Sequence, residues 1–193
     1  MIDKKEFAEM RKEYQEFDIG REELIKKSRD VLKLTKQVIY AVHRDDMKEA
    51  DSFVKEMQKD LHLLNEYIKK NQKMYHQGSY KVAIQEYVEA MLYYHYVQTG
   101  KLMSHVDLCV DTDYYLLGLC DLSGELVRKA ISAASKGNYK EPFKVKEFID
   151  AVYGELLKFE IRDGELRGKF DGIKYDLKKL EDVCFELKLK EKA

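Results

Sequence analysis

The sequence predicts an all-α fold, a single-domain bundle of about seven helices that takes up residues 1–193. One proline and ten glycines leave too few turn-forming residues for an all-β protein. Apolar side chains instead recur three and four residues apart, which is the spacing of one helix face. Apolar residues make up 45% and charged residues 37% of the chain, a mixture typical of a globular protein with its own core.

Three helices are expected in the N-terminal part of the chain. The first covers residues 4–17 and stops because Gly20 breaks it, since glycine is a poor helix former. The second covers residues 21–43 and places its apolar residues on one stripe. The third begins after a capping aspartate, Asp45 or Asp46, and continues to about residue 75.

Four further long helices are expected in the rest of the chain. The fourth begins at Ser79, a candidate N-cap, and ends near Gly100. Residues 104–108 are predicted to form a short additional helix, and Thr112 is predicted to cap the fifth long helix. Pro142 opens the sixth, because proline is favoured in the first turn of a helix.

The seventh helix follows a turn at Asp163 and Gly164 and carries a heptad repeat. A 4-3 apolar spacing sustained over three heptads predicts a seam that packs against a partner helix. Periodicity alone leaves open whether that partner lies in the same subunit or in another one. The seam residues are Leu166, Phe170, Ile173, Leu177, Leu180, Cys184 and Leu187.

Charge and composition argue against several classes of protein. A formal net charge of −1 disfavours a uniformly basic nucleic-acid binder, but it is compatible with a local basic patch. Three cysteines without paired spacing favour a reduced compartment, and we expect a cytoplasmic location. The charged N-terminus and the lack of a run of about 18 apolar residues predict no signal sequence and no membrane partner.

Four carboxylates interrupt two helices that are otherwise almost wholly apolar. Glu86 and Glu89 lie on the fourth predicted helix, and Asp121 and Glu125 lie on the fifth. A helix that is apolar on nearly every side is expected to be buried. A buried ionised carboxylate costs several kcal/mol unless a positive charge meets it. Basic side chains nearby in the sequence are too few, so a divalent cation is the simplest counter-charge.

The spacing of these acids predicts the kind of site that they form. Glu86 and Glu89 are three residues apart, and Asp121 and Glu125 are four apart, so each pair projects from one helix face. If the two helices are neighbours, all four carboxylates converge on one cavity. An all-oxygen site suits Mg²⁺, with Mn²⁺ as a substitute, and such an ion supports phosphoryl chemistry. The spacing leaves open whether one ion or two would bind.

Other interpretations of these residues stay open. Arg128 lies three residues after Glu125 and could neutralise it in a structural salt bridge, because buried ion-pair networks exist without function. A di-iron site is disfavoured, since the chain has no Glu-x-x-His motif. We interpret His95 as a hydrogen-bonding residue rather than a ligand, and Ser123 as a small residue that permits close helix packing.

Several stretches of the chain resemble the translin superfamily. The resemblance is carried by QEYVEA (85–90), DYYLLGLCDLSGELVRKAI (113–131) and LRGKFDGIKYDLKKLEDVCFEL (166–187), and SRDVLKLTKQVIYAVHR (28–44) is also similar. It therefore covers nearly the whole chain and implies the translin fold. Its most specific parts are the D-x-x-x-E block around Gly124 and the RGKFDGIKYDLKK block near the C-terminus.

Within the superfamily the chain resembles the branch of translin-associated factor X (TRAX). That branch carries a Mg²⁺-dependent endoribonuclease site made of four acids. The motif falls here on Glu86, Glu89, Asp121 and Glu125, which the resemblance implies to be both catalytic and metal-binding. The chain lacks an insertion that larger relatives carry after the helix of Glu89, as a compact archaeal-type homologue would. The resemblance also implies a homo-oligomer, a hollow octamer with the acids facing its interior.

The resemblance implies nucleic-acid contacts from Lys73, His76 and Lys81, just before the acidic helix. Arg128 is a further candidate, because a planar guanidinium suits phosphate oxygens. The alternative for the first three is a solvated helix end, and for Arg128 a plain salt bridge. The expected partners are single-stranded RNA and, as a second candidate, single-stranded DNA. A translin-like protein that binds without cutting, and a purely structural assembly, are the alternative functions.

Overall fold

A computed structural model of the chain describes residues 2–162 and 164–190. These residues form six α-helices and one short 3-10 helix, and no strand occurs among them. The predicted all-α class is therefore confirmed. The chain divides into two compact units, Met1–Tyr87 and Val88–Ala193. The single-domain organisation stays a prediction.

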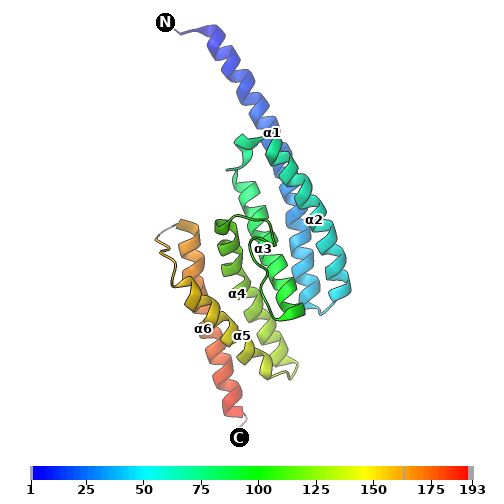
Figure 1. Ribbon diagram of the computed structural model, residues 1–193, viewed down its shortest axis with the longest axis vertical. Coiled ribbons are helices and arrows are strands. Elements are labelled where there is room, and N and C mark those ends of the chain that lie inside the picture. Colours follow the sequence, from blue (N-terminus) through cyan, green and yellow to red (C-terminus); the bar gives the residue numbers. More distant parts are fainter. Residues whose placement is uncertain (1, 163, 191–193) are drawn as a thin grey trace. The chain divides into compact units, whose positions relative to one another are not determined.

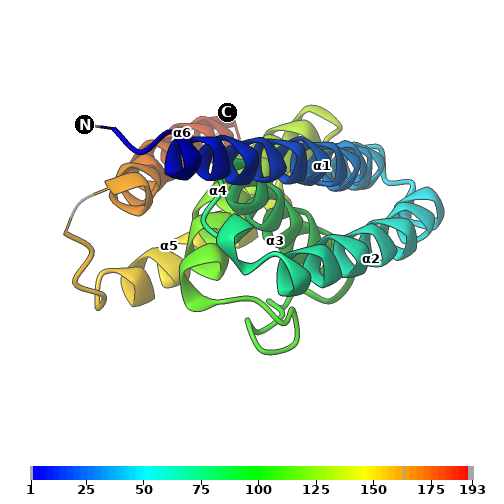
Figure 2. The same cartoon turned by 90° about the horizontal axis from the view of Figure 1, so that it is seen from above.

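The first unit is built on a hairpin of two long helices, α1 (Lys4–His43) and α2 (Met47–Lys70), which lie side by side in Figures 1 and 2. Asp46 caps α2, because its carboxylate accepts a hydrogen bond from the Glu49 backbone N–H at 3.0 Å. Of the two predicted caps, Asp46 is thus the one used. The core of the hairpin is apolar, and its most buried residues include Leu24, Val31, Val38, Val42, Ala50, Met57 and Leu64.

The predicted helix break at Gly20 is wrong, since α1 is continuous over 40 residues. A methyl group at Gly20 would come within 3.0 Å of Met74 Cε and 3.3 Å of the Tyr67 hydroxyl. That hydroxyl donates a hydrogen bond to the Gly20 carbonyl oxygen at 2.7 Å. Glycine therefore serves close approach inside this unit, and the low helix propensity of a single residue is outweighed by tertiary packing.

The third predicted helix is shorter than expected, because α2 ends at Lys70 rather than near residue 75. The Asn71 side-chain amide donates to the Tyr67 carbonyl at 3.0 Å, which satisfies an acceptor of the last helical turn. The chain then forms the 3-10 helix η1 (Gln72–Met74). The next helix, α3 (Gly78–Thr99), begins close to the predicted boundary.

The second unit contains the C-terminal turns of α3 together with α4 (Thr112–Ser135), α5 (Lys140–Leu156) and α6 (Gly164–Lys190). Each of α4, α5 and α6 packs against the other two. The heptad seam of α6 is buried within this unit, apart from the half-buried Leu166, so the seam packs inside the chain. Its buried residues are Phe170, Ile173, Leu177, Leu180, Cys184 and Leu187.

One predicted connection differs from expectation, and another lies partly outside the described residues. Residues 104–108 form no helix, and the structure has turns at 105–109 instead. The Ser104 hydroxyl donates to Asp107 Oδ2 at 2.6 Å and accepts from the Asp107 backbone N–H at 3.1 Å. Such local bonds satisfy polar groups without a helical ladder. At the other connection, Gly164 is the first residue of α6, whereas Asp163 lies outside the described residues.

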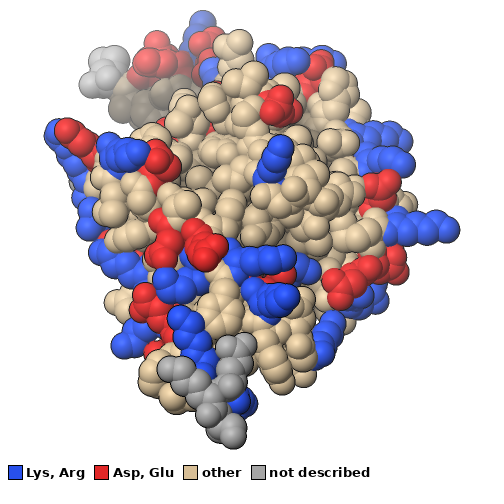
Figure 3. All heavy atoms as spheres, turned by 60° about the horizontal axis from the view of Figure 1, so that its bottom comes forward, with Lys and Arg blue, Asp and Glu red and all other residues tan. Residues whose placement is uncertain are grey.

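The surface of the molecule carries charged side chains of both signs (Figure 3). No helix in the part of the chain that the structure describes is both long and apolar enough to cross a membrane. On the face drawn in Figure 3, Lys and Arg side chains are mixed with Asp and Glu side chains. This mixture agrees with the net charge of −1. A nucleic acid would therefore have to be held by local groups of basic residues.

Candidate active site

The first predicted acidic pair lies on α3, one helical turn apart. Glu89 belongs to the second unit and is buried, with 9% of its surface exposed. Glu86 belongs to the first unit and is half-buried. α3 is buried because its apolar side chains point in all directions, and Leu92 and Tyr93 are 0% exposed.

The second predicted pair lies on α4, where Asp121 and Glu125 are again one turn apart. Their side chains have 23% and 22% of their surface exposed, so the prediction that these two carboxylates are buried is wrong. The physical reason is that α4 buries mainly one side. Leu119, Leu122 and Leu126 line the packing with α5 and α6, and the acids lie beside that apolar face.

Lys169 of α6 brings a positive charge to Asp121. Its ammonium Nζ lies 2.7 Å from Asp121 Oδ1 and 2.9 Å from Oδ2, and it donates to both. Burial alone would lower the pKa of Lys169, but the hydrogen bond to Asp121 and the negative charges of Asp121, Glu165 and Glu89 raise it above its usual value. Carboxylates from α3, α4 and α6 therefore act on one ammonium group.

Glu125 forms an ion pair with Arg128 one turn along α4. The guanidinium Nη1 lies 3.6 Å from Glu125 Oε2, and the Arg128 side chain is 58% exposed. The structure therefore shows the salt bridge that the sequence left open for Arg128. Most of the guanidinium still faces solvent, so its remaining N–H groups are accessible to a phosphate. A phosphate contact at Arg128 stays a prediction.

A second polar contact joins α4 to α6 beside the acids. Ser123 Oγ lies 2.7 Å from Asp176 Oδ2 and 2.8 Å from the Cys120 carbonyl oxygen, so its proton can be donated to either. Ser123 is thus a specific link between helices, which its small size alone did not predict. Burial and the charge of Asp121 raise the pKa of the neighbouring Cys120 thiol to about 12, so that thiol is protonated and is no nucleophile.

The predicted ligands suit a hard divalent cation by their chemistry. Glu89, Asp121 and Glu125 offer carboxylate oxygens, which Mg²⁺ and Mn²⁺ prefer. The ammonium of Lys169 already occupies a place beside Asp121 with Glu89 near it, so the site stabilises positive charge. Across residues 2–162 and 164–190, however, no three His, Cys, Asp or Glu side chains are arranged to hold a metal ion. The four-acid ligand set therefore stays a prediction.

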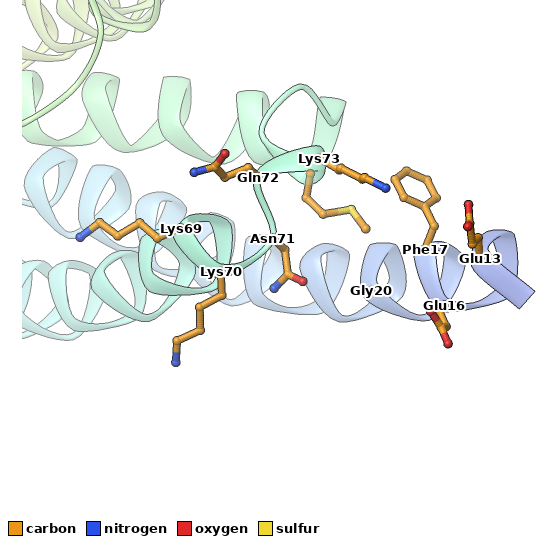
Figure 4. Close-up of a pocket in the computed structure, with 10 residues that line it drawn as sticks. Glu13, Glu16, Phe17, Gly20, Lys69, Lys70, Asn71, Gln72 and Lys73 are labelled. Atoms are coloured by element: carbon orange, nitrogen blue, oxygen red, sulfur yellow. The ribbon is translucent and has the colours of Figure 1, made fainter.

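Lys73, a predicted nucleic-acid contact, lies on a groove of about 650 Å³ in the first unit. In Figure 4 the Lys73 side chain extends from η1 toward the ring of Phe17 on α1. Cations beside an aromatic ring are a combination that suits single-stranded nucleic acid. Two acidic residues of α1, Glu13 and Glu16, also line the groove. Its basic lining residues are Lys69, Lys70 and Lys73.

The two other candidates of this region lie nearby in the sequence. His76 is exposed and packs edge-on against the Tyr75 ring, with the ring centroids 5.2 Å apart. Lys81 is exposed in the first turns of α3. Both side chains are accessible within the first unit, and their contacts to nucleic acid stay predictions.

Lys169 is the residue of this site that sequence analysis missed. It lies 48 residues from Asp121, so no helical spacing links the two. One signal was available, because Lys169 directly precedes the seam residue Phe170 and belongs to the RGKFDGIKYDLKK stretch. A residue next to a buried seam position is placed at the edge of the helix interface.

Known proteins similar in sequence include both branches of one family. The model of the Translin family matches residues 20–191. Translin-associated protein X of Rattus norvegicus is 29% identical over 212 residues, which cover 88% of this chain and 72% of that protein. Translin of Gallus gallus is 32% identical over 81 residues, and the match covers 42% of this chain but only 35% of that protein.

Solved structures give the same assignment. The crystal structure of apo-NeC3PO matches with a TM-score of 0.86 and 30% identity, and the match covers 97% of this chain and 98% of that one. AfC3PO in a duplex RNA complex matches with a TM-score of 0.81 over 96% of this chain and 97% of that one, and at 24% identity it shows the fold. The chain thus belongs to the translin family, with relatives in TRAX and translin.

Proposed function

We propose that this protein is a Mg²⁺-dependent endoribonuclease that cleaves single-stranded RNA inside a homo-oligomeric shell, with Mn²⁺ as a substitute ion. One observation carries the proposal. Asp121 on α4 and Glu89 on α3, which are far apart in the sequence, both act on the single positive charge of Lys169. The similarity to translin-associated protein X over 88% of the chain supports it.

The acids divide into roles by their surroundings. Buried Glu89 is oriented by packing, whereas Asp121 and Glu125 keep enough exposure to meet a substrate. Together with Glu86 one turn earlier, they would hold the ion directly or through water. A bound Mg²⁺ supplies Lewis-acid chemistry, because it neutralises charge on a phosphoryl oxygen and makes water more acidic. Arg128 would bind a phosphate oxygen beside Glu125.

The RNA and the assembly rest on separate observations. The related fold of AfC3PO has been solved with duplex RNA, which supports an RNA ligand for this chain. An oligomer is supported by apolar side chains on the first turns of α1, where Phe7, Met10 and Tyr14 are 46%, 45% and 70% exposed. Their spacing of three and four residues forms one stripe, as a helix that packs against another subunit would have.

The test is cleavage of labelled single-stranded and duplex RNA in Mg²⁺, in EDTA and with the Glu125→Ala variant. We expect cleavage of the single strand that stops in EDTA and falls by roughly a hundredfold in Glu125→Ala. Glu186→Ala, an exposed acid on α6, is the matched control and should keep full activity. Cleavage that continues both in EDTA and in Glu125→Ala would remove the proposal.

A translin-like protein that binds RNA or single-stranded DNA without cutting it is the second candidate. The observation in its favour is that Lys169 and Arg128 already neutralise Asp121 and Glu125 without a metal. This function predicts binding that weakens steeply as the salt concentration rises. It also predicts intact RNA after prolonged incubation with Mg²⁺ or Mn²⁺, which separates it from the nuclease.

A further inference from the structure

Lys169 is a cation that the chain itself supplies to its acidic site. Its ammonium group donates to both oxygens of Asp121, at 2.7 and 2.9 Å. The side chains of both residues are half-buried, with 25% and 23% of their surface exposed. A pair of this kind is screened only partly by water, so it is stronger than an ion pair on the open surface.

The position of Lys169 matters because Asp121 is also a proposed metal ligand. A carboxylate that already accepts two hydrogen bonds from an ammonium can hold a divalent ion only if that contact is weakened or broken. The ammonium also repels any second positive charge placed within a few ångströms of it. The charge of Glu89 acts on the same ammonium, so two proposed ligands share this counter-charge.

We propose that Lys169 competes with the divalent cation for Asp121 and thereby sets how tightly the site binds metal. This inference rests on the proposed function. In the metal-free protein Lys169 holds Asp121 in place. When an ion binds, the Lys169 side chain moves off Asp121, and its four-carbon stem allows the ammonium to reach solvent or the phosphate of a substrate.

Lys169 lies on α6, whose packed seam holds the backbone, so its ammonium group starts from a defined position beside Asp121. It directly precedes Phe170, which is 4% exposed in the α6 seam, so the backbone of Lys169 is fixed by packing. Only the side chain has to move. Lys174 on the same helix offers a matched comparison, because it pairs with Asp171 at 3.0 Å and is 52% exposed. The charged groups that act on it are Asp171, Tyr153 and Arg167, and none of the four candidate ligands is among them.

The experiment measures Mn²⁺ binding to the full-length protein by the loss of the free-ion electron paramagnetic resonance signal. Lys169→Gln should bind Mn²⁺ about tenfold more tightly than the wild type, because one repulsive unit charge is removed beside the ion. Lys174→Gln should leave the affinity unchanged. Unchanged or weaker binding in Lys169→Gln overturns the inference.

A second variant covers the case in which Lys169→Gln does not fold. Lys169→Arg keeps the positive charge and pairs with a carboxylate through two N–H groups, so it should bind Mn²⁺ roughly threefold more weakly than the wild type. Equal or tighter binding in Lys169→Arg contradicts the inference. Thermal melting supplies an independent readout, since Mn²⁺ should raise the melting temperature of Lys169→Gln more than that of the wild type.

The outcome for this inference is separable from the outcome for the nuclease. If Lys169→Gln binds Mn²⁺ more tightly but neither protein cleaves RNA, the competition stands and the nuclease proposal fails. If the wild type cleaves RNA in Mg²⁺ while Lys169→Gln leaves Mn²⁺ affinity unchanged, the nuclease stands and the competition fails. If neither protein binds Mn²⁺, both fail.

Discussion

The α1–α2 hairpin and the α4–α5–α6 bundle use their charged residues differently. In the hairpin, a pair such as Lys55 and Asp51 joins residues one turn apart on the same helix, and both side chains are well exposed. In the bundle, Lys169 of α6 reaches Asp121 of α4 at a partly buried interface. Exposed pairs within a helix add little to stability, whereas partly buried pairs between helices fix side chains in place.

This difference shows which region is suited to chemistry. The hairpin interface is closed mainly by apolar side chains, with close approach at Gly20. In the bundle, polar groups lie between α4 and α6, where Ser123 also donates to Asp176. Removing such groups from water costs free energy that their hydrogen bonds offset. Polar groups held at such an interface are positioned for a ligand, so the candidate site lies there.

The largest expected effect comes from removing one core leucine in each region. Leu64→Ala in the hairpin and Leu180→Ala in the bundle, both 0% exposed, should each lower the free energy of unfolding by about 2–5 kcal/mol. Urea unfolding followed by circular dichroism measures this, with the half-exposed Leu63→Ala as the control. A single domain predicts one shared transition. Two transitions, each shifted by only one variant, would contradict the single-domain organisation.

The two regions should respond in opposite directions to filling a helical glycine. Gly20→Val should lower the free energy of unfolding by about 1–3 kcal/mol, because its side chain would meet Met74 and Tyr67. Gly124→Ala should raise it by about 0.5–1 kcal/mol, since alanine is the better helix former. The nearest atom to the added methyl group of Gly124→Ala is Asp176 Oδ2 at 4.0 Å. Thermal melts of both variants would refute this contrast if the changes had the same sign.

The hydrogen bonds between helices can be compared by deleting one in each region. Tyr67→Phe removes the hydroxyl that donates to Gly20, and Ser123→Ala removes the one that lies against Asp176. Each variant should lose about 1 kcal/mol of the free energy of unfolding. The double variant should lose the sum, because the two contacts share no partner. Chemical denaturation of the three variants measures these losses in the free energy of unfolding. A double variant that loses no more than either single variant would show that the two contacts are coupled.

The smallest expected effect is a pH dependence in the hairpin. Burial and the charges of Asp30 and Glu56 raise the pKa of Asp60 above 3.8, and Lys59 only partly opposes them. The folded state therefore binds this proton more tightly than the unfolded state, so ionisation of Asp60 lowers stability as the pH rises above 3.8. Asp60→Asn should be more stable than the wild type by roughly a few tenths of a kcal/mol at pH 7, since water screens the group.

The measurement for Asp60 is a pair of thermal melts across pH. The advantage of Asp60→Asn should vanish below pH 3.8, where the wild-type carboxyl is protonated in both states. An advantage that persisted at low pH would show that it comes from packing or helix propensity. A variant less stable than the wild type at pH 7 would show that Asp60 is stabilised by its ionised form.

Local patterns in the sequence were sufficient for most helices but misled at single residues. The helix boundaries near Asp46, Ser79 and Thr112 could be predicted, because boundary signals act within one turn of the helix end. Of the three predicted caps only Asp46 is confirmed, since α3 already begins at Gly78 and Asp111 is the N-cap of α4. Gly20 could not, since its role depends on Tyr67, which lies 47 residues away. The pair of Glu125 and Arg128 could be predicted from helical spacing, whereas the link from Asp121 to Lys169 could not.

By itself, the sequence determined that the chain is helical, where most helices begin and end, and that two acidic pairs lie on helix faces. Those features depend on backbone propensity, capping and the 3.6-residue period, which act over a few residues. Only the tertiary structure decided that α1 runs unbroken through Gly20 and that Lys169 meets Asp121. Contacts between residues far apart in the chain depend on how helices pack, and packing is a property of the whole fold.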